Sequence, residues 1–250
     1  MLVYSDANAK TKALYDVPEL AHWLGGGRKV VSLDLLSGFS CPFAEECLSK
    51  AVTLENGRRK IKDGPKTKFR CFSASQEVQY TGVYNRRSKN YKILKPLSTS
   101  SMVDLLVEAM PKKTGIVRIH VAGDFFNQKY FDAWVSMANR FPHILFYAYT
   151  KSLRYWVARL DEIPYNLVLT ASMGGREDYL ADDYSLRKTH VIFSENEAAT
   201  MGLEIDHSDE HAAVPEWREN DFALLIHGTQ PKGSDAAVAL KELKGVGSYS

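Results

Sequence analysis

The sequence has no long apolar run and few cysteines. No stretch approaches the roughly 20 consecutive apolar residues that cross a bilayer, and residues 1–12 lack the apolar segment of a secretory signal peptide. The 3 cysteines cannot all pair as disulfides, and disulfides are rare in reducing compartments. The sequence therefore predicts a cytoplasmic protein without membrane contact, whose cysteines serve another purpose.

Several familiar catalytic motifs are also missing. The run Gly25-Gly26-Gly27 precedes an apolar stretch and lacks the Lys-Ser/Thr that follows a phosphate-binding loop. No G-x-S-x-G nucleophile elbow occurs. His120 stands inside an apolar run, as core histidines do. These absences exclude the corresponding nucleotide-binding and hydrolase sites.

Short and nearly continuous apolar runs indicate strands that are buried on both faces. They cover residues 30–36, 116–121, 144–149, 167–171, 190–193 and 222–227. Helical stripes lie between them, at 101–110, after Asp124, and at 152–160. A longer helix is expected over 73–91, with Ser73 and Gln76 spaced as a capping box.

Regular alternation of strand and helix predicts right-handed βαβ crossovers. We expect a single α/β domain with about four to six parallel strands. The strands form either a partial β/α (TIM-like) barrel or an open parallel sheet. Both architectures bind ligands at the carboxyl ends of their strands.

Charge is distributed unevenly along the chain. The net charge is +2, but residues 50–95 contain 13 basic and 3 acidic residues and so carry +10, which leaves −8 for the rest. An acidic C-terminal region covers about 175–221. The basic segment suits nucleic acid or an acidic protein partner, and its alternative is a solvated helical face with a flexible loop. The candidate phosphate ligands are Arg58, Arg59, Lys60, Arg86 and Arg87.

The cysteines lie where such a fold would bind a ligand. Cys41 and Cys47 follow the first strand, in a loop expected to enter a helix, and Cys71 lies at another expected helix start. Thiols near helix N-termini have lowered pKa values and bind metals well. The sequence therefore predicts a metal centre on Cys41, Cys47 and Cys71, and three thiolates without a fourth favour a [4Fe–4S] cluster with one open iron.

Two alternatives stay open. Free cysteines are often buried as small hydrophobic side chains. Zinc is the other alternative, because His207 and His211 have the spacing of helical metal ligands. The acidic residues around these histidines, Asp206, Asp209 and Glu210, favour an exposed helix or loop instead.

Four segments resemble the phage gene product 88 family. They are SGFSCP at 37–42, FRC at 69–71, HVAGDFF at 120–126 and FYAYT at 146–150, and the likeness runs from about Val30 to Ser172. The resemblance implies a bacteriophage origin and action inside the infected host, without a particular chemistry. Relatives with further cysteines near the C-terminus imply a second metal site, which is not expected here because no cysteine follows Cys71.

More distantly, the layout is similar to that of radical S-adenosylmethionine (SAM) enzymes, which are partial β/α barrels with three cluster cysteines after the first strand. That resemblance implies an open iron chelated by SAM, with Gly123 and Asp124 beside its amino group and Thr150, Ser172 and Ser194 over the same cavity. The cysteine spacing departs from the familiar cluster motif. Asp124 also fits a helix N-cap, and a structural cluster that supports the basic segment is the non-enzymatic alternative.

Overall fold

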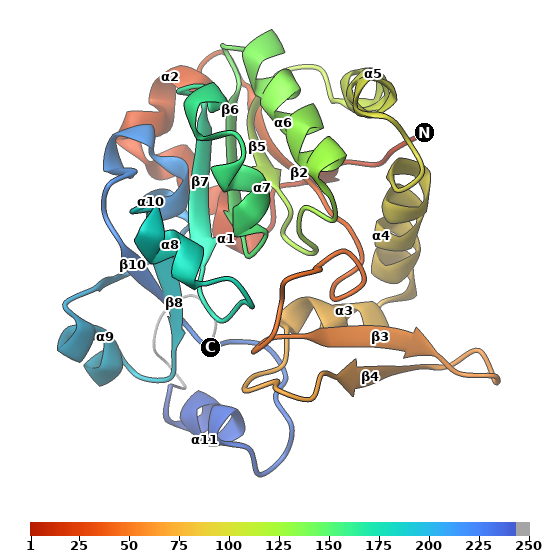
Figure 1. The fold of residues 1–250 in the computed structure, drawn as a ribbon, viewed down its shortest axis with the longest axis vertical. Coiled ribbons are helices and arrows are strands. Elements are labelled where there is room, and N and C mark those ends of the chain that lie inside the picture. Colours follow the sequence, from red (N-terminus) through yellow and green to blue (C-terminus); the bar gives the residue numbers. More distant parts are fainter. Residues whose placement is uncertain (244–250) are drawn as a thin grey trace.

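One large sheet organises the domain (Figure 1). The computed structural model describes residues 1–243. Within them the strand order is β1-β2-β5-β6-β7-β8-β10-β9, and every pair is parallel except β1 with β2. Its strands are β1 (Ser5–Asp6), β2 (Lys29–Leu33), β5 (Thr114–Ile119), β6 (Leu145–Thr150), β7 (Leu167–Ser172), β8 (Lys188–Ile192), β9 (Glu204–Ile205) and β10 (Phe222–Leu225). A separate antiparallel hairpin consists of β3 (Ser49–Thr53) and β4 (Arg59–Asp63).

Helices connect the strands and flank both ends of the chain. The α-helices are α1 (Ala9–Lys12), α2 (Ala21–Leu24), α3 (Phe72–Gln79), α4 (Thr81–Leu94), α5 (Thr99–Ala109), α6 (Gln128–Arg140), α7 (Leu153–Val157), α8 (Tyr179–Asp183), α9 (Glu195–Met201), α10 (Glu210–Ala213) and α11 (Asp235–Glu242). Short 3₁₀ helices are η1 (Ala13–Asp16), η2 (Pro18–Leu20), η3 (Leu160–Glu162) and η4 (Pro215–Trp217). No helix of the described residues is long and apolar enough to cross a membrane.

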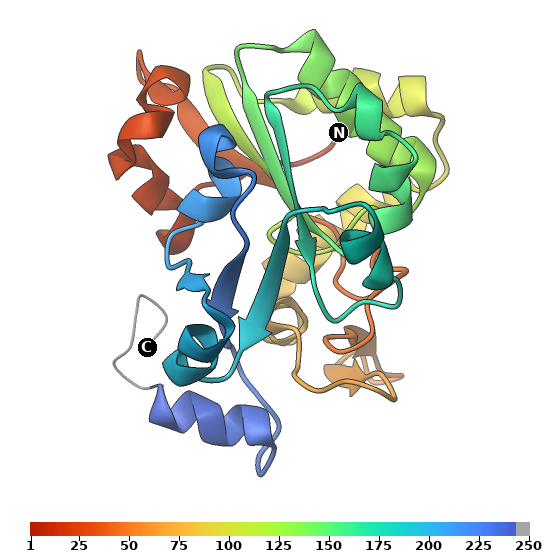
Figure 2. The same ribbon diagram turned by 60° about the vertical axis from the view of Figure 1, so that its left-hand side comes forward.

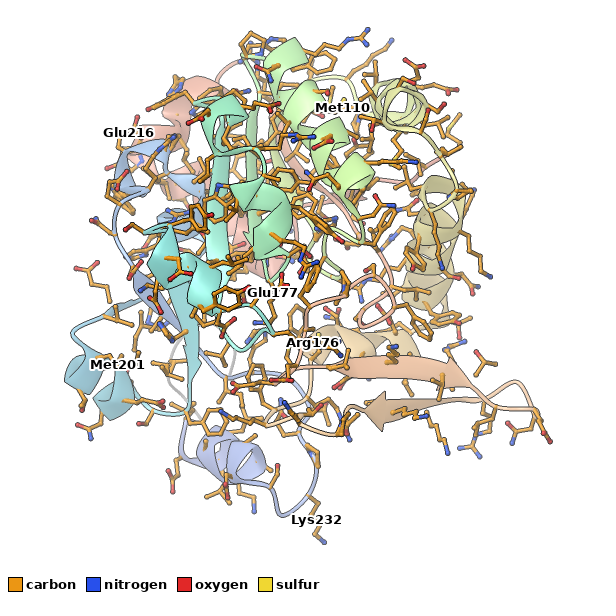
Figure 3. The ribbon with its side chains drawn as sticks, in the orientation of Figure 1. Met110, Arg176, Glu177, Met201, Glu216 and Lys232 are labelled. Carbon is orange, nitrogen blue, oxygen red and sulfur yellow. The ribbon has the colours of Figure 1, made fainter. Side chains whose placement is uncertain are left out.

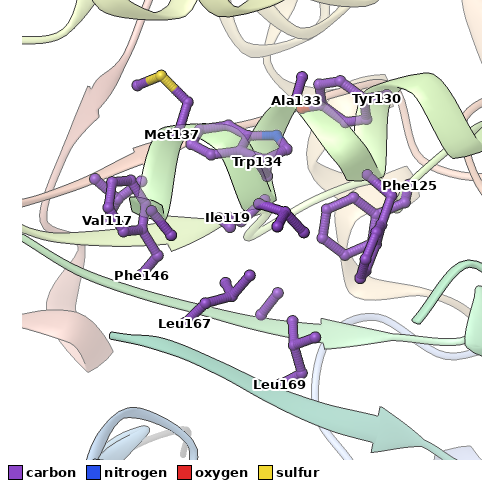
Figure 4. Packing of buried hydrophobic residues seen from close by; sticks show 14 of the residues in the cluster. Val117, Ile119, Phe125, Tyr130, Ala133, Trp134, Met137, Phe146, Leu167 and Leu169 are labelled. Carbon is purple, nitrogen blue, oxygen red and sulfur yellow. The ribbon is translucent and has the colours of Figure 1, made fainter. Parts of the chain in front are cut away.

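The larger core lies between the sheet and helices α4 to α8. From β2 to β8 each new strand is added on the same side of the last, so right-handed crossovers place their helices on one face. Helix α6 buries one stripe against this face, where Trp134 packs near Phe146 of β6 (Figure 4). The alternation of side chains along β5 sends Val117 and Ile119 into the same core.

The opposite face is covered by the N-terminal helices and α10 (Figure 2). Strand β9 lies outside β10, so the connection through α10 runs back toward β8 and falls on the other side of the sheet. Leu14, Leu20 and Trp23 share this second core with Val214 and Phe222. The two cores therefore enclose the sheet from both sides at its amino end.

The predicted fold class is confirmed. Each of the six predicted strands is present, and the sheet is open, with β1 and β9 at its two ends. The single helix over 73–91 is wrong, because extended backbone at Tyr80 separates α3 from α4. Helix α3 begins after Cys71, without the capping box expected from Ser73. The hairpin β3–β4 stands where a helical face and a flexible loop were the alternative prediction.

Candidate functional site

A cavity of about 690 Å³ opens at the carboxyl ends of the central strands and continues along the sheet face that carries α1. This volume lies within the range of small-molecule sites, roughly 300–1,000 Å³. The predicted metal ligands and cofactor residues all line it: Cys41, Cys47, Cys71, Gly123, Asp124, Thr150 and Ser172. The structure therefore brings these residues together at one cavity, at the strand ends where the rule predicts ligand binding.

Cys41 is held by the loop that follows β2. The backbone N–H of Gly38 donates to Cys41 Sγ at 3.3 Å, and the Ser40 hydroxyl donates to the carbonyl of Leu36 at 2.7 Å. Gly123 packs directly on this loop: a Cβ at that position would lie 2.6 Å from Ser40 Oγ. The loop runs into β3, so the helix expected around Cys47 is absent.

The loop after β7 supports the segment between the first two cysteines. The carbonyl of Gly174 accepts hydrogen bonds from the backbone N–H groups of Glu45 and Glu46, at 3.3 and 3.0 Å. The backbone N–H of Arg176 donates to the carbonyl of Phe43 at 2.9 Å. Arg176 and Glu177 mark this loop in Figure 3. The cysteine loop is thus tied to the sheet edge along its length.

Cys71 reaches the cavity from the start of α3, as predicted. Its backbone N–H donates to the hydroxyl of Ser49 at 3.3 Å. The preceding residue, Arg70, exchanges two backbone hydrogen bonds with the Gln230 side chain, at 2.7 and 3.0 Å. Gly228 lies so close to Phe72 that a Cβ would come within 2.5 Å of the Phe72 Cβ. Chain segments about 160 residues apart therefore position this cysteine together.

Burial has a larger effect on the pKa values of the three thiols than the helix N-terminus has. Desolvation raises the pKa of Cys41, together with the charges of Asp124 and the other two cysteines. Desolvation also raises the pKa of Cys47, which the ammonium group of Lys151 counteracts. The pKa of Cys71 is raised to about 11 by burial, although the N–H groups of Ser73 and Ala74 lower it. The expected lowering of the thiol pKa values is wrong for this state of the protein.

Asp124 joins the ends of β5 and β6. Its carboxylate accepts hydrogen bonds from the hydroxyl of Thr150 at 2.6 Å and the backbone N–H groups of Phe125 and Lys151 at 2.7 and 2.9 Å. Burial raises the pKa of Asp124 to about 6, against these hydrogen bonds and the charge of Lys151. Asp124 is not the N-cap of α6, which is Asn127.

Lys151 is the cation whose charge lowers the pKa of Cys47. Its side chain is buried, and its ammonium group donates to the carbonyl and hydroxyl of Ser172 at 2.7 and 3.0 Å and to the carbonyl of Met173. Ser172 therefore faces the cavity while it orients Lys151. Ser194, expected beside it, instead caps α9 through Glu197 and is not part of the lining.

The floor of the cavity holds an ionic network that the sequence analysis missed. Arg118 pairs with Asp209, and its guanidinium group stacks on the Tyr149 ring with a centroid distance of 5.2 Å. Lys10 pairs with the other oxygen of Asp209 at 2.9 Å. The sequence offered one indication of this network, since Arg118 lies inside an otherwise apolar strand and must there have a charged partner.

The acidic stretch around Asp209 is buried, which corrects the expected exposed helix or loop. Asp206 and Asp209 are 1% and 0% exposed, because basic side chains and tyrosine hydroxyls surround them. His211 is also buried and bonds to Glu204 at 3.0 Å. Neither His207 nor His211 lines the cavity with the cysteines. Within residues 1–243, no group of three or more His, Cys, Asp or Glu side chains is arranged to hold a metal ion.

His120 belongs to the core, as predicted. Its backbone has a positive φ of 73°, and its ring packs against Tyr130 of α6 with a centroid distance of 5.6 Å. There Nε2 lies 3.0 Å from the Tyr130 hydroxyl. Burial and the charge of Arg118 lower the pKa of His120 to about 3, so the ring is neutral.

Comparison with known proteins gives one family. Residues 1–242 match the family model described as gene product 88, which covers nearly all of the chain. No curated protein and no solved structure matches the chain. The resemblance to radical SAM enzymes therefore has no support from these comparisons.

Proposed function

Because the chain belongs to the gene product 88 family and gathers three cysteines at one cavity, we propose that it is an iron–sulfur protein with a small-molecule site. Cys41, Cys47 and Cys71 would hold a [4Fe–4S] cluster. The observation that supports this most is that thiols from two separate segments line the same cavity, where burial and the charges of Cys71 and Cys47 raise the pKa of Cys41. Such a cluster, when bound, supplies an electron carrier with one iron open to an exogenous ligand.

We propose a cluster in preference to a single ion. The ligands of one tetrahedral zinc ion converge to roughly 3.8 Å from each other, given Zn–S bonds of about 2.3 Å. The ligands of a cluster bind different irons and stay further apart. We assign the three thiols, which reach one cavity from two segments of the chain, to separate irons of such a cluster. Metal binding deprotonates the thiols, and Lys151 lies where it offsets part of the resulting negative charge at Cys47.

SAM is the ligand that we propose for the open iron. The cavity volume suits a small molecule, and Asp124 still has capacity for an amino group. A carboxylate offers about four acceptor sites, of which Phe125, Thr150 and Lys151 use three. In this proposal Asp124 and Thr150 shape the wall beside the ligand, and Gly123 lets that wall approach the cysteine loop.

Anaerobic purification tests the cluster. We expect brown protein with iron and acid-labile sulfide near four of each per chain, and loss of both when Cys41, Cys47 or Cys71 is replaced by Ser. Stoichiometric zinc without iron would overturn the proposal. The free thiols of the three variants should be counted under denaturing conditions, to verify that each lost only one.

SAM binding is tested on the iron-loaded protein. Addition of SAM should change the electron paramagnetic resonance spectrum of the reduced cluster, and Asp124→Asn should weaken that change while iron content stays the same. If SAM leaves the spectrum unchanged, the cluster is structural and the SAM part of the proposal fails.

A further inference from the structure

The hairpin β3–β4 places part of the predicted basic segment on a single face. In its register Lys50 lies opposite Lys62 and Val52 lies opposite Lys60. Residues that pair directly across two strands point to the same side of the ribbon. The other side is occupied, because Ala51 is fully buried and Arg59 donates to the Glu77 carbonyl of α3 at 2.9 Å. The three lysines therefore share the outer face of the hairpin.

This face has no internal counter-charge. Among residues 1–243, Lys50, Arg58, Lys60 and Lys62 form no salt bridge, whereas the next cations along the chain are paired. Those paired cations are Lys66 with Glu45, Lys68 with Glu46 and Arg70 with Asp63. Like charges directly opposite each other destabilise a hairpin, so the pairing of Lys50 with Lys62 costs stability that a bound anion would restore.

Aromatic side chains lie beside two of the lysines of this basic surface. Phe39, which is 41% exposed, lies under the ammonium group of Lys50 at 5.1 Å from the ring centroid. The Tyr91 hydroxyl donates to the Phe39 carbonyl at 3.0 Å, and the ammonium group of Lys95 lies 5.4 Å from the Tyr91 ring. Cations beside an exposed ring are the elements that bind phosphates and unstacked bases together.

We propose that this surface, formed by Lys50, Arg58, Lys60, Lys62, Lys95 and the ring of Phe39, binds single-stranded nucleic acid. A single strand is favoured over a duplex because only unpaired bases can stack on a side chain such as Phe39. The chain's net charge is only +2, so the cations are concentrated here and are not a general property of the surface.

The surface adjoins the proposed cluster site. A Cβ at Gly38, in the cysteine loop, would lie 2.4 Å from the carbonyl oxygen of Ser49 at the start of β3. A strand bound along the hairpin therefore passes beside the loop of Cys41. The inference deepens the proposed function by naming nucleic acid as the substrate class, but binding itself requires no cluster, so the two proposals can fail separately.

Fluorescence anisotropy with a labelled oligothymidylate of about 12 nucleotides tests the surface. The five cations of this surface predict a slope of about −3.5 in a plot of log binding constant against log salt concentration. The triple variant Lys50→Gln, Lys60→Gln, Lys62→Gln should reduce the steepness by about 2. Phe39→Leu should weaken binding about tenfold and leave the slope unchanged.

The matched control removes three exposed lysines elsewhere, Lys112→Gln, Lys113→Gln and Lys129→Gln, and should keep both slope and affinity. An equal loss in the control variant, tighter binding of a duplex of the same length, or no binding at low salt would each overturn the inference. Iron content is measured for every sample. Binding by protein that contains no iron even after anaerobic purification would support the surface, while the missing iron would contradict the cluster proposal.

Discussion

Glu77 of α3 holds Ser37 of the cysteine loop with both carboxylate oxygens. One oxygen accepts from the Ser37 backbone N–H at 3.0 Å and the other from its hydroxyl at 2.8 Å. Arg87 of α4 pairs with the same carboxylate at 3.2 Å, and all three side chains are buried. The helix that begins at Cys71 is thereby fixed to the loop that carries Cys41.

Replacement of Glu77 by Gln should therefore loosen the cysteine site. The amide cannot accept at both positions, and Arg87 loses the nearer of its two charged partners in a buried setting, at a cost of about 3 kcal/mol. We expect a lower urea midpoint together with reduced iron content. Asp132→Asn is the control, because its pair with Arg159 is partly exposed and contributes no more than about 1 kcal/mol. Equal effects of the two substitutions would contradict the positioning role of Glu77.

Two glycines should respond oppositely to alanine. Gly123 has a φ of 94°, and a Cβ there would meet Ser40 Oγ at 2.6 Å and Leu35 Cβ at 2.8 Å. Gly123→Ala should destabilise the fold by about 2 kcal/mol and lower iron content. Gly82 lies inside α4, and a Cβ at that position would have no neighbouring atom within 4 Å, so Gly82→Ala should stabilise by about 0.5–1 kcal/mol. The midpoints of thermal unfolding of both variants are compared with that of the parent protein. A Gly123→Ala protein as stable as the parent would show that the cysteine loop can move to make room for the Cβ.

The Asp209 network predicts an acid-sensitive part of the stability. Burial alone would raise the pKa of Asp209, but Arg118 and Lys10 outweigh it and hold that pKa at about 2. Because this lies below the unfolded value of about 3.9, the stabilisation is complete above about pH 5 and is lost progressively as the pH falls through 4 and 2. Its size is about 2 kcal/mol.

Urea unfolding of Asp209→Asn beside the parent protein measures this contribution. The difference in unfolding free energy should be constant from pH 7 to about pH 5 and shrink between about pH 4 and pH 2. Burial and the charge of Asp209 both raise the pKa of Asp206, so Asp206 titrates at a lower pH in the Asp209→Asn variant and contributes to the measured difference. A difference that does not depend on pH would mean that Asp209 is not ionised in the native state.

The sheet was predictable because its strands are buried on both faces. Runs such as 144–149 and 167–171 are apolar throughout, and the strand-end rule then placed Cys41, Asp124 and Thr150 at one cavity. The hairpin was not found, since β4 has a single apolar residue, Ile61. Its one local signal was Asn56-Gly57, a dipeptide typical of tight hairpin turns.

The contacts that complete the site could not be read from local patterns. Glu77 with Ser37 and Arg118 with Asp209 join residues 40 and 91 positions apart. A single sequence contains no information on which charges meet across such distances. The acidic stretch around Asp209 therefore resembled a solvated surface, although its carboxylates are neutralised inside the domain.

The second core packs Leu14, Leu20 and Trp23 against Val214 and Phe222, so it cannot be completed until the C-terminal part of the chain has been synthesised. At about 5–20 residues per second, the ribosome needs roughly 10–40 s to make the 200 or so residues between the two halves of this core. The N-terminal helices can pack on Val30, Ile116 and Leu145 before then, but their contacts with Val214 and Phe222 must wait that long. This core therefore stays incomplete in the nascent chain until the last strand has emerged.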